Sequence, residues 1–296
     1  MTNNIRGAIY MSVSMAGFSL NDALIKLVCA DLPLFQAIFV RGLLTVLLMT
    51  GVVWHVAPGW PTLAPRDIRW LALRMAGEVG GTLCFLTALI HLPLADATAI
   101  LQMMPMVMTL AAALLLGEQV GWRRYLAVLI GFAGMLLIVR PGADGISIYA
   151  VMALGAVVFF CLRDLATRQI SGQLPAVLIT LVTSVTITTT GAVLTALTDW
   201  QTMRVDQFAG LAVCAVAVAA GYLFGVSAMR CGDVSAVSPF RYAILLWAIL
   251  LGILFFGEYP DWQMLLGAAI LVIAGLYTVH RERQVAKQTT RTSPAD

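Results

Sequence analysis

Charged residues are scarce in this chain, and their scarcity argues against a soluble protein. Only 11% of the 296 residues are Asp, Glu, Lys or Arg, whereas 60% are hydrophobic, and the mean hydropathy is +0.92. A soluble domain is about one quarter charged, and a chain this apolar would expose too much hydrophobic surface to water. The composition therefore predicts a membrane protein. The net charge of +3 is too small to indicate a nucleic-acid partner.

Several chemical signatures are also missing. The five cysteines are an odd number without C-x-x-C spacing, and most lie in apolar stretches, so neither a disulfide framework nor a metal site is expected. The three histidines do not form the zinc-hydrolase pattern, and no G-x-x-x-x-G-K-[ST] loop for ATP is present. Residues 1–6 are too short and polar for a signal peptide. We therefore expect no cofactor and no metal.

Ten apolar runs are each long enough to cross a bilayer, which takes about 20 residues per helix. They are 7–29, 34–54, 68–91, 95–117, 122–140, 147–169, 174–197, 206–229, 234–257 and 262–280. Short connections that carry Pro, Gly or Asp join them. The predicted fold class is an all-α polytopic membrane protein with ten transmembrane helices. A polar tail, 281–296, is expected to be disordered.

Lys and Arg near the helix ends predict how the chain is oriented, because cytoplasmic loops are enriched in them. One side collects Arg6, Arg66, Arg69, Arg123, Arg124, Arg168, Arg230, Arg281, Arg283, Lys287 and Arg291, and the other has Lys26, Arg140 and Arg204. This asymmetry, with an even number of spans, predicts a protein of the bacterial inner membrane with both termini in the cytoplasm.

The chain also repeats itself after about 140 residues. The matching positions are Leu116-Gly117-Glu118 with Phe256-Gly257-Glu258, Trp122 with Trp262, Phe18 and Asp22 with Phe160 and Asp164, and Gly77 and Gly81 with Ala217 and Gly221. Each half, 1–140 and 141–280, would hold five helices, an odd number, so the second copy must be inverted. Inverted repeats are a recurring transporter plan, with the substrate near the midplane between the halves. The small residues predict that helices 3 and 8 pack tightly or flank the path.

Seven ionisable residues fall at membrane depth, where each costs about 2.5–3.5 kcal/mol on insertion scales and so needs a partner or a purpose. They are Asp22, Arg41, Arg74, Glu78, Arg163, Asp164 and Arg241. Their depths predict an outer Asp22–Arg41 pair, an inner cluster of Arg163, Asp164 and Arg241, and Glu78 near the midplane. Such a layout would suit two gates around a central site. Arg74 and Glu78 are four residues apart on one helix and could pair there.

Other readings of these charges stay open at this point. Arg74 and Arg163 could instead extend to the headgroups, the Asp22–Arg41 pair could be purely structural, and Glu78 or Asp22 could take up a proton during transport. Glu118 and Glu258 stand at helix ends beside glycine and are interpreted as structural.

Uncharged residues add further candidates for the site. Pro105 should kink the fourth helix and free a carbonyl, and Gln102 lies one turn before it. The run Ser238-Pro239-Phe240-Arg241-Tyr242 begins the ninth helix, with Trp247 beyond it, and Tyr222 lies in the eighth. The hydroxyl-rich seventh helix is a weak signal, since such side chains can bond their own backbone. Gly131, Gly134, Gly267 and Gly275 could serve a homodimer or only tight packing.

Taken together, these residues resemble the drug/metabolite transporter superfamily, in particular its EamA-type members. The resemblance covers residues 7–280. Its most specific stretches are Leu116-Gly117-Glu118 with Arg123 and Arg124, Gly131-Phe132-Ala133-Gly134, and Ser238-Pro239-Phe240-Arg241-Tyr242 through Trp247 to Phe256-Gly257-Glu258. The Pro-Phe-Arg-Tyr run, with Arg41 and Arg74, is similar to a subgroup that includes S-adenosylmethionine and riboflavin uptake transporters. The resemblance implies alternating access around a cavity lined by helices 1, 3, 4, 6, 8 and 9.

The predicted function is that of a secondary transporter for a small polar or zwitterionic metabolite, such as an amino acid, a vitamin or a cofactor-like compound. A proton-coupled exporter of metabolites or drugs is the alternative. An intramembrane enzyme would need a nucleophile with a base, or metal ligands, at membrane depth, and no histidine lies at a matching depth. A channel is disfavoured because neither a ring of like charges nor a re-entrant loop is visible.

Overall fold

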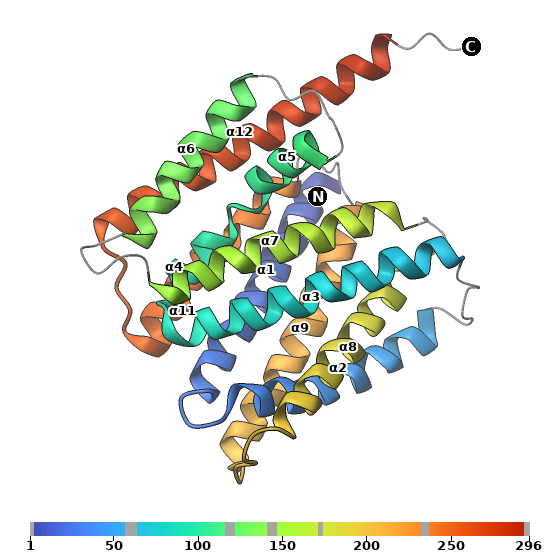
Figure 1. Ribbon diagram of the computed structural model, residues 1–296, viewed down its shortest axis with the longest axis vertical. Helices are drawn as coiled ribbons and strands as arrows, with labels where there is room; N and C mark the ends of the chain where they lie inside the picture. The colour runs from blue at the N-terminus through green and yellow to red at the C-terminus, as the bar shows by residue number, and fades with distance from the viewer. Residues whose placement is uncertain are drawn as a thin grey trace.

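The computed structural model describes residues 3–56, 64–115, 122–140, 147–170, 174–231 and 237–292, and all regular structure in them is helical (Figure 1). In these ranges eight helical stretches are long and apolar enough to cross a membrane. Two shorter apolar helices, Tyr125–Val139 and Trp262–Thr278, stand where the fifth and tenth spans are expected. The predicted ten-helix membrane architecture is therefore confirmed.

The helices follow one another in two similar series. The first is α1 (Asn3–Val28), α2 (Leu34–Val56), α3 (Pro65–His91), α4 (Leu94–Leu101), α5 (Met104–Leu115) and α6 (Trp122–Val139). The second is α7 (Ile148–Gln169), α8 (Ala176–Thr195), α9 (Val205–Cys231), the 3-10 helix η1 (Ser238–Tyr242), α11 (Ala243–Leu251), the π-helical turn η2 (Gly252–Phe256) and α12 (Trp262–Thr292).

The C-terminal helix α12 continues into the polar tail and extends past the other helices at the upper right of Figure 1. The disorder expected for 281–296 and the division of the chain at residue 140 stay predictions.

The fourth helix of each half is interrupted, in place of the unbroken helices predicted over 95–117 and 234–257. In the first half α4 ends at Leu101, and a turn at Gln102 and Met103 leads into α5. Pro105 causes the break, because it lacks the N–H that the Leu101 carbonyl would accept, so the kink predicted there is confirmed. In the second half Pro239 lies in η1, whose last residue, Tyr242, comes 140 residues after Gln102.

Helices pair across the two halves (Figure 1). α1 packs along α9, α3 along α7, α2 along α8, and α6 along α12. Numbered as membrane spans, these pairs are 1 with 8, 3 with 6, 2 with 7 and 5 with 10. Spans 1 to 5 correspond to spans 6 to 10 in the repeat. Exchanging the two halves therefore converts the pair 1 with 8 into the pair 6 with 3, and leaves the pairs 2 with 7 and 5 with 10 unchanged. That is the packing expected of two inverted five-helix repeats, which confirms the predicted duplication.

Two glycines allow the cross-half pairs to touch backbone to backbone. A Cβ atom on Gly77 of α3 would stand 2.8 Å from both the backbone nitrogen of Arg163 and the carbonyl oxygen of Phe159 in α7. A Cβ on Gly17 of α1 would stand 2.7 Å from the carbonyl oxygen of Ala217 of α9. Because Gly17 matches Phe159 and Gly77 matches Ala217 in the repeat, this is one contact made twice. Spans 3 and 8 pack tightly, as predicted, each against a span of the other half.

The glycines of α6 and α12 are also used within the chain. A Cβ on Gly267 would stand 2.6 Å from the Gly134 carbonyl oxygen, so the two helices meet there. Gly275 lies against the Tyr242 hydroxyl and Gly131 against the Met106 side chain. These contacts favour the packing interpretation of the four glycines, and a homodimer stays a prediction.

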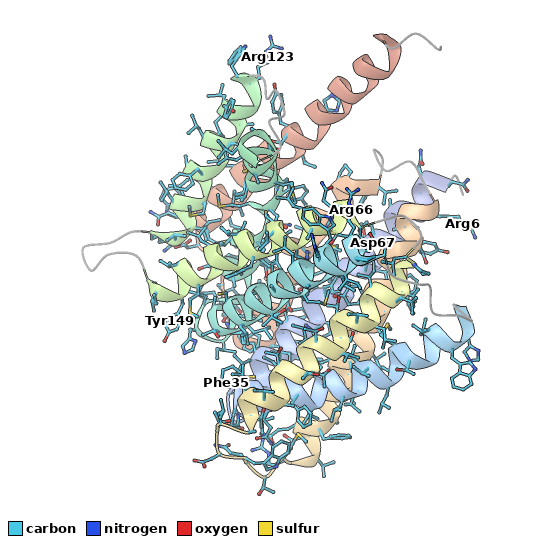
Figure 2. All side chains as sticks on the ribbon, turned by 45° about the vertical axis from the view of Figure 1, so that its right-hand side comes forward. Arg6, Phe35, Arg66, Asp67, Arg123 and Tyr149 are labelled. Carbon is cyan, nitrogen blue, oxygen red and sulfur yellow. The ribbon has the colours of Figure 1, made fainter. Side chains whose placement is uncertain are left out.

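The bundle has two distinct ends. Figure 2 shows Arg123 at the top, Arg66 near the middle and Arg6 at the right, whereas Tyr149 and Phe35 lie toward the lower left. The helices α1, α3 and η2 finish at one end of the bundle, which we call the "Glu258 end". The helix α1 begins at the opposite end, which we call the "N-terminal end".

Ion pairs join the segments at the Glu258 end. Lys26 binds Glu258, Arg140 binds Asp261, and Arg204 lies 3.3 Å from Asp31. The Asp261 carboxylate also accepts a hydrogen bond from the Met264 N–H at 2.9 Å, at the start of α12. The hydrogen bond from Arg140 and the one from Met264 hold the pKa of Asp261 below its usual range. All three basic residues that the sequence assigns to this side are therefore paired with acids.

The contact at Gly77 predicts a difference between two glycine substitutions. Gly77→Ala should force α3 and α7 apart at about 1–3 kcal/mol, the usual cost of overpacking, and lower the midpoint of thermal unfolding in detergent. Gly51→Ala is the matched control, because a Cβ there meets no atom within 4 Å and alanine is the better helix former. Equal midpoints for the two variants would contradict the tight contact.

Candidate substrate cavity

A cavity of about 700 Å³ lies at the centre of the bundle. It is lined by residues of α1, α3, α4, α5, α7, α9, η1 and α11, the helices that the family resemblance implies. α2 and α8 line it too, through Arg41, Gly42, Thr45, Thr183, Ser184 and Ile187. The seventh span, where hydroxyls were a weak signal, therefore belongs to the cavity wall.

Nine of the eleven candidate site residues line this one cavity. They are Asp22, Arg41, Arg74, Glu78, Gln102, Arg163, Asp164, Tyr222 and Arg241. Trp247 and Tyr242 are not in its lining: Trp247 packs beside the cluster of Met11, Met15, Ala228 and Val237, and the Tyr242 hydroxyl lies against Gly275. The charges line the wall of one shared space, and their role as two gates around a central site stays a prediction.

Arg163 joins two carboxylates on the wall. Its Nε donates to Asp164 Oδ1 at 2.7 Å, and its Nη1 lies 3.4 Å from Glu78 Oε2. The guanidinium also stands 4.6 Å from the centre of the Phe160 ring. The Arg74–Glu78 pair that the spacing on α3 allowed is not among the ion pairs of the described residues, where Glu78 pairs with Arg163 of α7. The approach of the helices at Gly77 explains this, because it brings the Arg163 backbone against α3.

Arg74 reaches across the cavity wall to two hydroxyls. Its Nη1 donates to Thr167 Oγ1 at 2.9 Å and its Nη2 to Thr183 Oγ1 at 3.3 Å. Thr183 in turn donates to the Ile179 carbonyl at 2.8 Å. Most other hydroxyls of α8 also bond the carbonyl four residues before them, as was weighed for this helix. Arg74 and Arg163 thus both bind side chains of neighbouring helices.

Asn21 stands between Asp22 and Arg41. Arg41 Nη1 donates to Asn21 Oδ1 at 2.9 Å, and Asn21 Nδ2 donates to Asp22 Oδ1 at 2.9 Å. Among the described residues no direct ion pair joins Asp22 to Arg41, so the predicted pair is replaced by a bridge through an amide. The sequence held a signal for Asn21, because the shift that matches Asp22 with Asp164 also matches Asn21 with Arg163.

Among the described residues, the cavity lining reaches an exposed side chain toward the N-terminal end. Arg241, near the start of the ninth span, both lines the cavity and is exposed. Between the cavity and the Glu258 end lies an apolar cluster whose members Ile25, Leu89, Leu94 and Ala97 are completely buried. In the described residues the cavity thus has an exposed arginine on one side and a buried apolar cluster on the other.

The position of Arg163 predicts a double-mutant effect on stability. Arg163→Gln leaves Glu78 and Asp164 without their guanidinium, and removing one partner of a buried pair costs about 3–5 kcal/mol in a dry interior and less where water reaches. The unfolding midpoint in detergent should fall. Glu78→Gln/Arg163→Gln should recover part of the loss, because one uncompensated carboxylate is gone. Strictly additive losses would contradict the pair.

Known proteins resemble this chain in both sequence and fold. The sequence profile described as the EamA-like transporter family matches residues 5–140 and 147–280. A riboflavin transporter of Vibrio cholerae is 29% identical over 77% of this chain and 76% of its own length. The pseudopaline exporter CntI of Pseudomonas aeruginosa is 28% identical over 90% of this chain and 94% of its own, and an S-adenosylmethionine uptake transporter of Rickettsia prowazekii is 23% identical over 95% and 94%.

A solved crystal structure shares the fold. It aligns with a TM-score of 0.63 over 94% of this chain and 98% of its own, at 17% identity. The matched family and the named relatives are transporters, so the prediction of a transporter in place of an enzyme is confirmed.

Proposed function

The chain belongs to the EamA-like transporter family, and from that premise we propose that it carries a small zwitterionic metabolite through the central cavity by alternating access. By their names, one of the relatives moves its metabolite inward and one outward, and the name of the riboflavin transporter gives no direction, so similarity to them does not fix the direction of transport. The substrate class is argued below from the charges of the cavity.

The observation that carries the proposal is the separated pair of opposite charges at Asp22 and Arg41. Both line the cavity, and Asn21 bonds one oxygen of Asp22 and one nitrogen of Arg41. Each therefore keeps further hydrogen-bonding atoms for a ligand. By contrast, Glu78 and Asp164 both contact Arg163, so each already has a charged partner within the wall.

The amide of Asn21 also indicates which ligand groups fit. It presents an acceptor to Arg41 and a donor to Asp22. A zwitterion with an ammonium and a carboxylate on the same carbon presents the same two groups in the same order, with full charges. Charge-assisted hydrogen bonds are about twice as strong as neutral ones. The remaining wall, with Phe18, Phe85, Tyr222 and Met104, suits an apolar or aromatic body on such a molecule.

Excess positive charge near the opening fits the same ligand. The cavity wall holds four arginines and three acids. With Arg163 and Arg74 set against Glu78 and Asp164, and Arg41 against Asp22, the excess charge is that of Arg241. Its exposed position at the open end would attract a carboxylate before the ligand reaches Arg41.

Uptake by the purified protein in liposomes tests the function. S-adenosylmethionine, which carries an ammonium and a carboxylate, should enter saturably, and riboflavin serves as the comparison without that pair of charges. Asp22→Asn and Arg41→Met should each raise KM about tenfold or more, since a hydrogen bond to a charged group contributes about 1.5–3 kcal/mol. Arg140→Gln, outside the cavity lining, should leave uptake unchanged.

Three results would count against the proposal. Uptake that rises linearly with concentration would indicate a channel. Unchanged KM in Asp22→Asn and Arg41→Met would remove the zwitterion site. Faster uptake of riboflavin than of S-adenosylmethionine would mean that the protein is a transporter for another class of substrate. An imposed pH gradient added to the same assay separates proton-coupled transport, the alternative function, from exchange or facilitated diffusion.

The membrane orientation is part of the proposal. We place the chain in the bacterial inner membrane with both termini in the cytoplasm, supported by the excess of Lys and Arg on the side of Arg6, Arg66 and Arg123. The cavity of this structure would then open toward the cytoplasm. A green fluorescent protein fused after Asp296 should fluoresce and an alkaline phosphatase fused there should stay inactive; the reverse pattern would invert the orientation.

A further inference from the structure

Lys26 and Glu258 form an ion pair that the cavity itself does not use. Lys26 Nζ lies 2.6 Å from Glu258 Oε1 and donates a second hydrogen bond to the Leu92 carbonyl at 2.5 Å. The ammonium also stands 5.0 Å from the centre of the Phe256 ring. The side chains of Lys26 and Glu258 are only 12% and 24% exposed. A lysine so well enclosed and so fully bonded holds its neighbours in one arrangement.

The second carboxylate oxygen of Glu258 binds the start of α4. It accepts a hydrogen bond from the Leu94 N–H at 2.7 Å, one of the four amides at a helix start that lack an intrahelical partner. Gly257, at φ 64°, adopts the left-handed conformation between η2 and Glu258, which glycine adopts at no steric cost. Through two side chains the pair thus connects α1, the α3–α4 link, α4 and the end of η2.

The pair lies over the closed end of the cavity. Ile25 neighbours Lys26 in sequence, Leu94 donates to Glu258, and both belong to the buried apolar cluster between the pair and the cavity. Ala97, one turn into α4, is completely buried in that cluster, and the next residue, Thr98, already lines the cavity. A path to the Glu258 end must therefore part α1 from α4 and η2, which are the segments that the pair joins.

We propose that Lys26 and Glu258 are functional residues of the transport cycle: their ion pair closes the cavity at the Glu258 end and breaks each time the cavity opens there. The proposal rests on alternating access, which belongs to the proposed function. It replaces the structural interpretation that the sequence suggested for Glu258. The pair lies at helix ends, where water can hydrate both charges once the segments part, so breaking it costs less than in a dry core.

Arg140 and Asp261 provide a matched control at the same end. Their ion pair is more exposed, with side chains 45% and 43% accessible. It joins the end of α6 to the start of α12, and neither helix lines the cavity. A general loosening of the Glu258 end would follow from losing either pair, whereas opening of the cavity should follow only from losing Lys26–Glu258.

Cysteine labelling in detergent measures the opening without any substrate. The labelled chain has its own five cysteines replaced. In it, Ala97→Cys reports access through the Glu258 end. Ala268→Cys reports unfolding, because Ala268 lies on α12 and is buried in the cluster that this helix shares with α6. The rate of reaction with a charged maleimide at position 97 should rise about tenfold or more in Lys26→Met and in Glu258→Gln, because a charge-assisted hydrogen bond is lost. Gln at 258 can still accept the bond from Leu94, which protects the fold.

The outcomes separate closure from mere stability. The labelling rate at position 268 should be the same in all variants, and Arg140→Gln should leave the labelling rate at position 97 unchanged. The double variant Lys26→Met/Glu258→Gln should react no faster than the faster single variant, since both remove the same interaction. Equal acceleration at 97 and 268, acceleration by Arg140→Gln, or no acceleration at 97 would each overturn the closure.

Failure of this proposal can be told apart from failure of the proposed function. Faster labelling at position 97 of the Lys26 and Glu258 variants, without uptake of S-adenosylmethionine by the parent protein, would support closure by the ion pair and reject the proposed substrate class. Saturable uptake without faster labelling would keep the transporter and reject the closure.

Discussion

Two close contacts between helices bring α3 against α7 and α1 against α9, the helices that hold five of the seven charged residues of the cavity. At Gly77 the backbone of α3 meets that of α7, and at Gly17 α1 meets α9, with no room for a side chain in either case. Helices that pack this closely can form hydrogen bonds and ion pairs with each other, and the surrounding hydrocarbon offers no such partners. Arg163 reaches Glu78 because of the first contact. A bulkier residue at Gly77 would separate the helices before it touched any charged group.

The two halves use the same positions for different electrostatic purposes. In the second half Arg163 stands beside Asp164 and compensates it, whereas in the first half the matching residue is Asn21, an uncharged amide beside Asp22. The match continues at Arg41, whose counterpart is Thr183, the hydroxyl that Arg74 binds. A symmetric pair of helices thereby produces an asymmetric cavity, with one compensated cluster and one separated pair of charges. An inverted repeat accounts for the scaffold, and departures from the repeat account for the binding wall.

The fourth span of each half is interrupted beside the cavity, and the described residues at the two ends of the bundle differ. Pro105 breaks the fourth span of the first half near the cavity, and Pro239 lies in the 3-10 helix at the start of the described part of the fourth span of the second half. Toward the Glu258 end, α4 and η2 are tied to α1 by one lysine and one glutamate. Toward the other end Arg241 is exposed. The family match makes such an imbalance meaningful, since a transporter must close one end while the other is open.

The sequence by itself determined the ten helices, their inverted duplication, the break at Pro105 and the seven charged residues that line the cavity. The physical reason is that hydrocarbon forces a spanning segment to satisfy its own backbone, so length and apolarity are enough to predict a helix. Only the tertiary structure decided the partners: Glu78 with Arg163 instead of Arg74, Asn21 between Asp22 and Arg41, and Lys26 with Glu258. A partner on another helix depends on how far each helix is rotated about its axis and how closely two backbones approach. Residue spacing along one helix contains neither quantity.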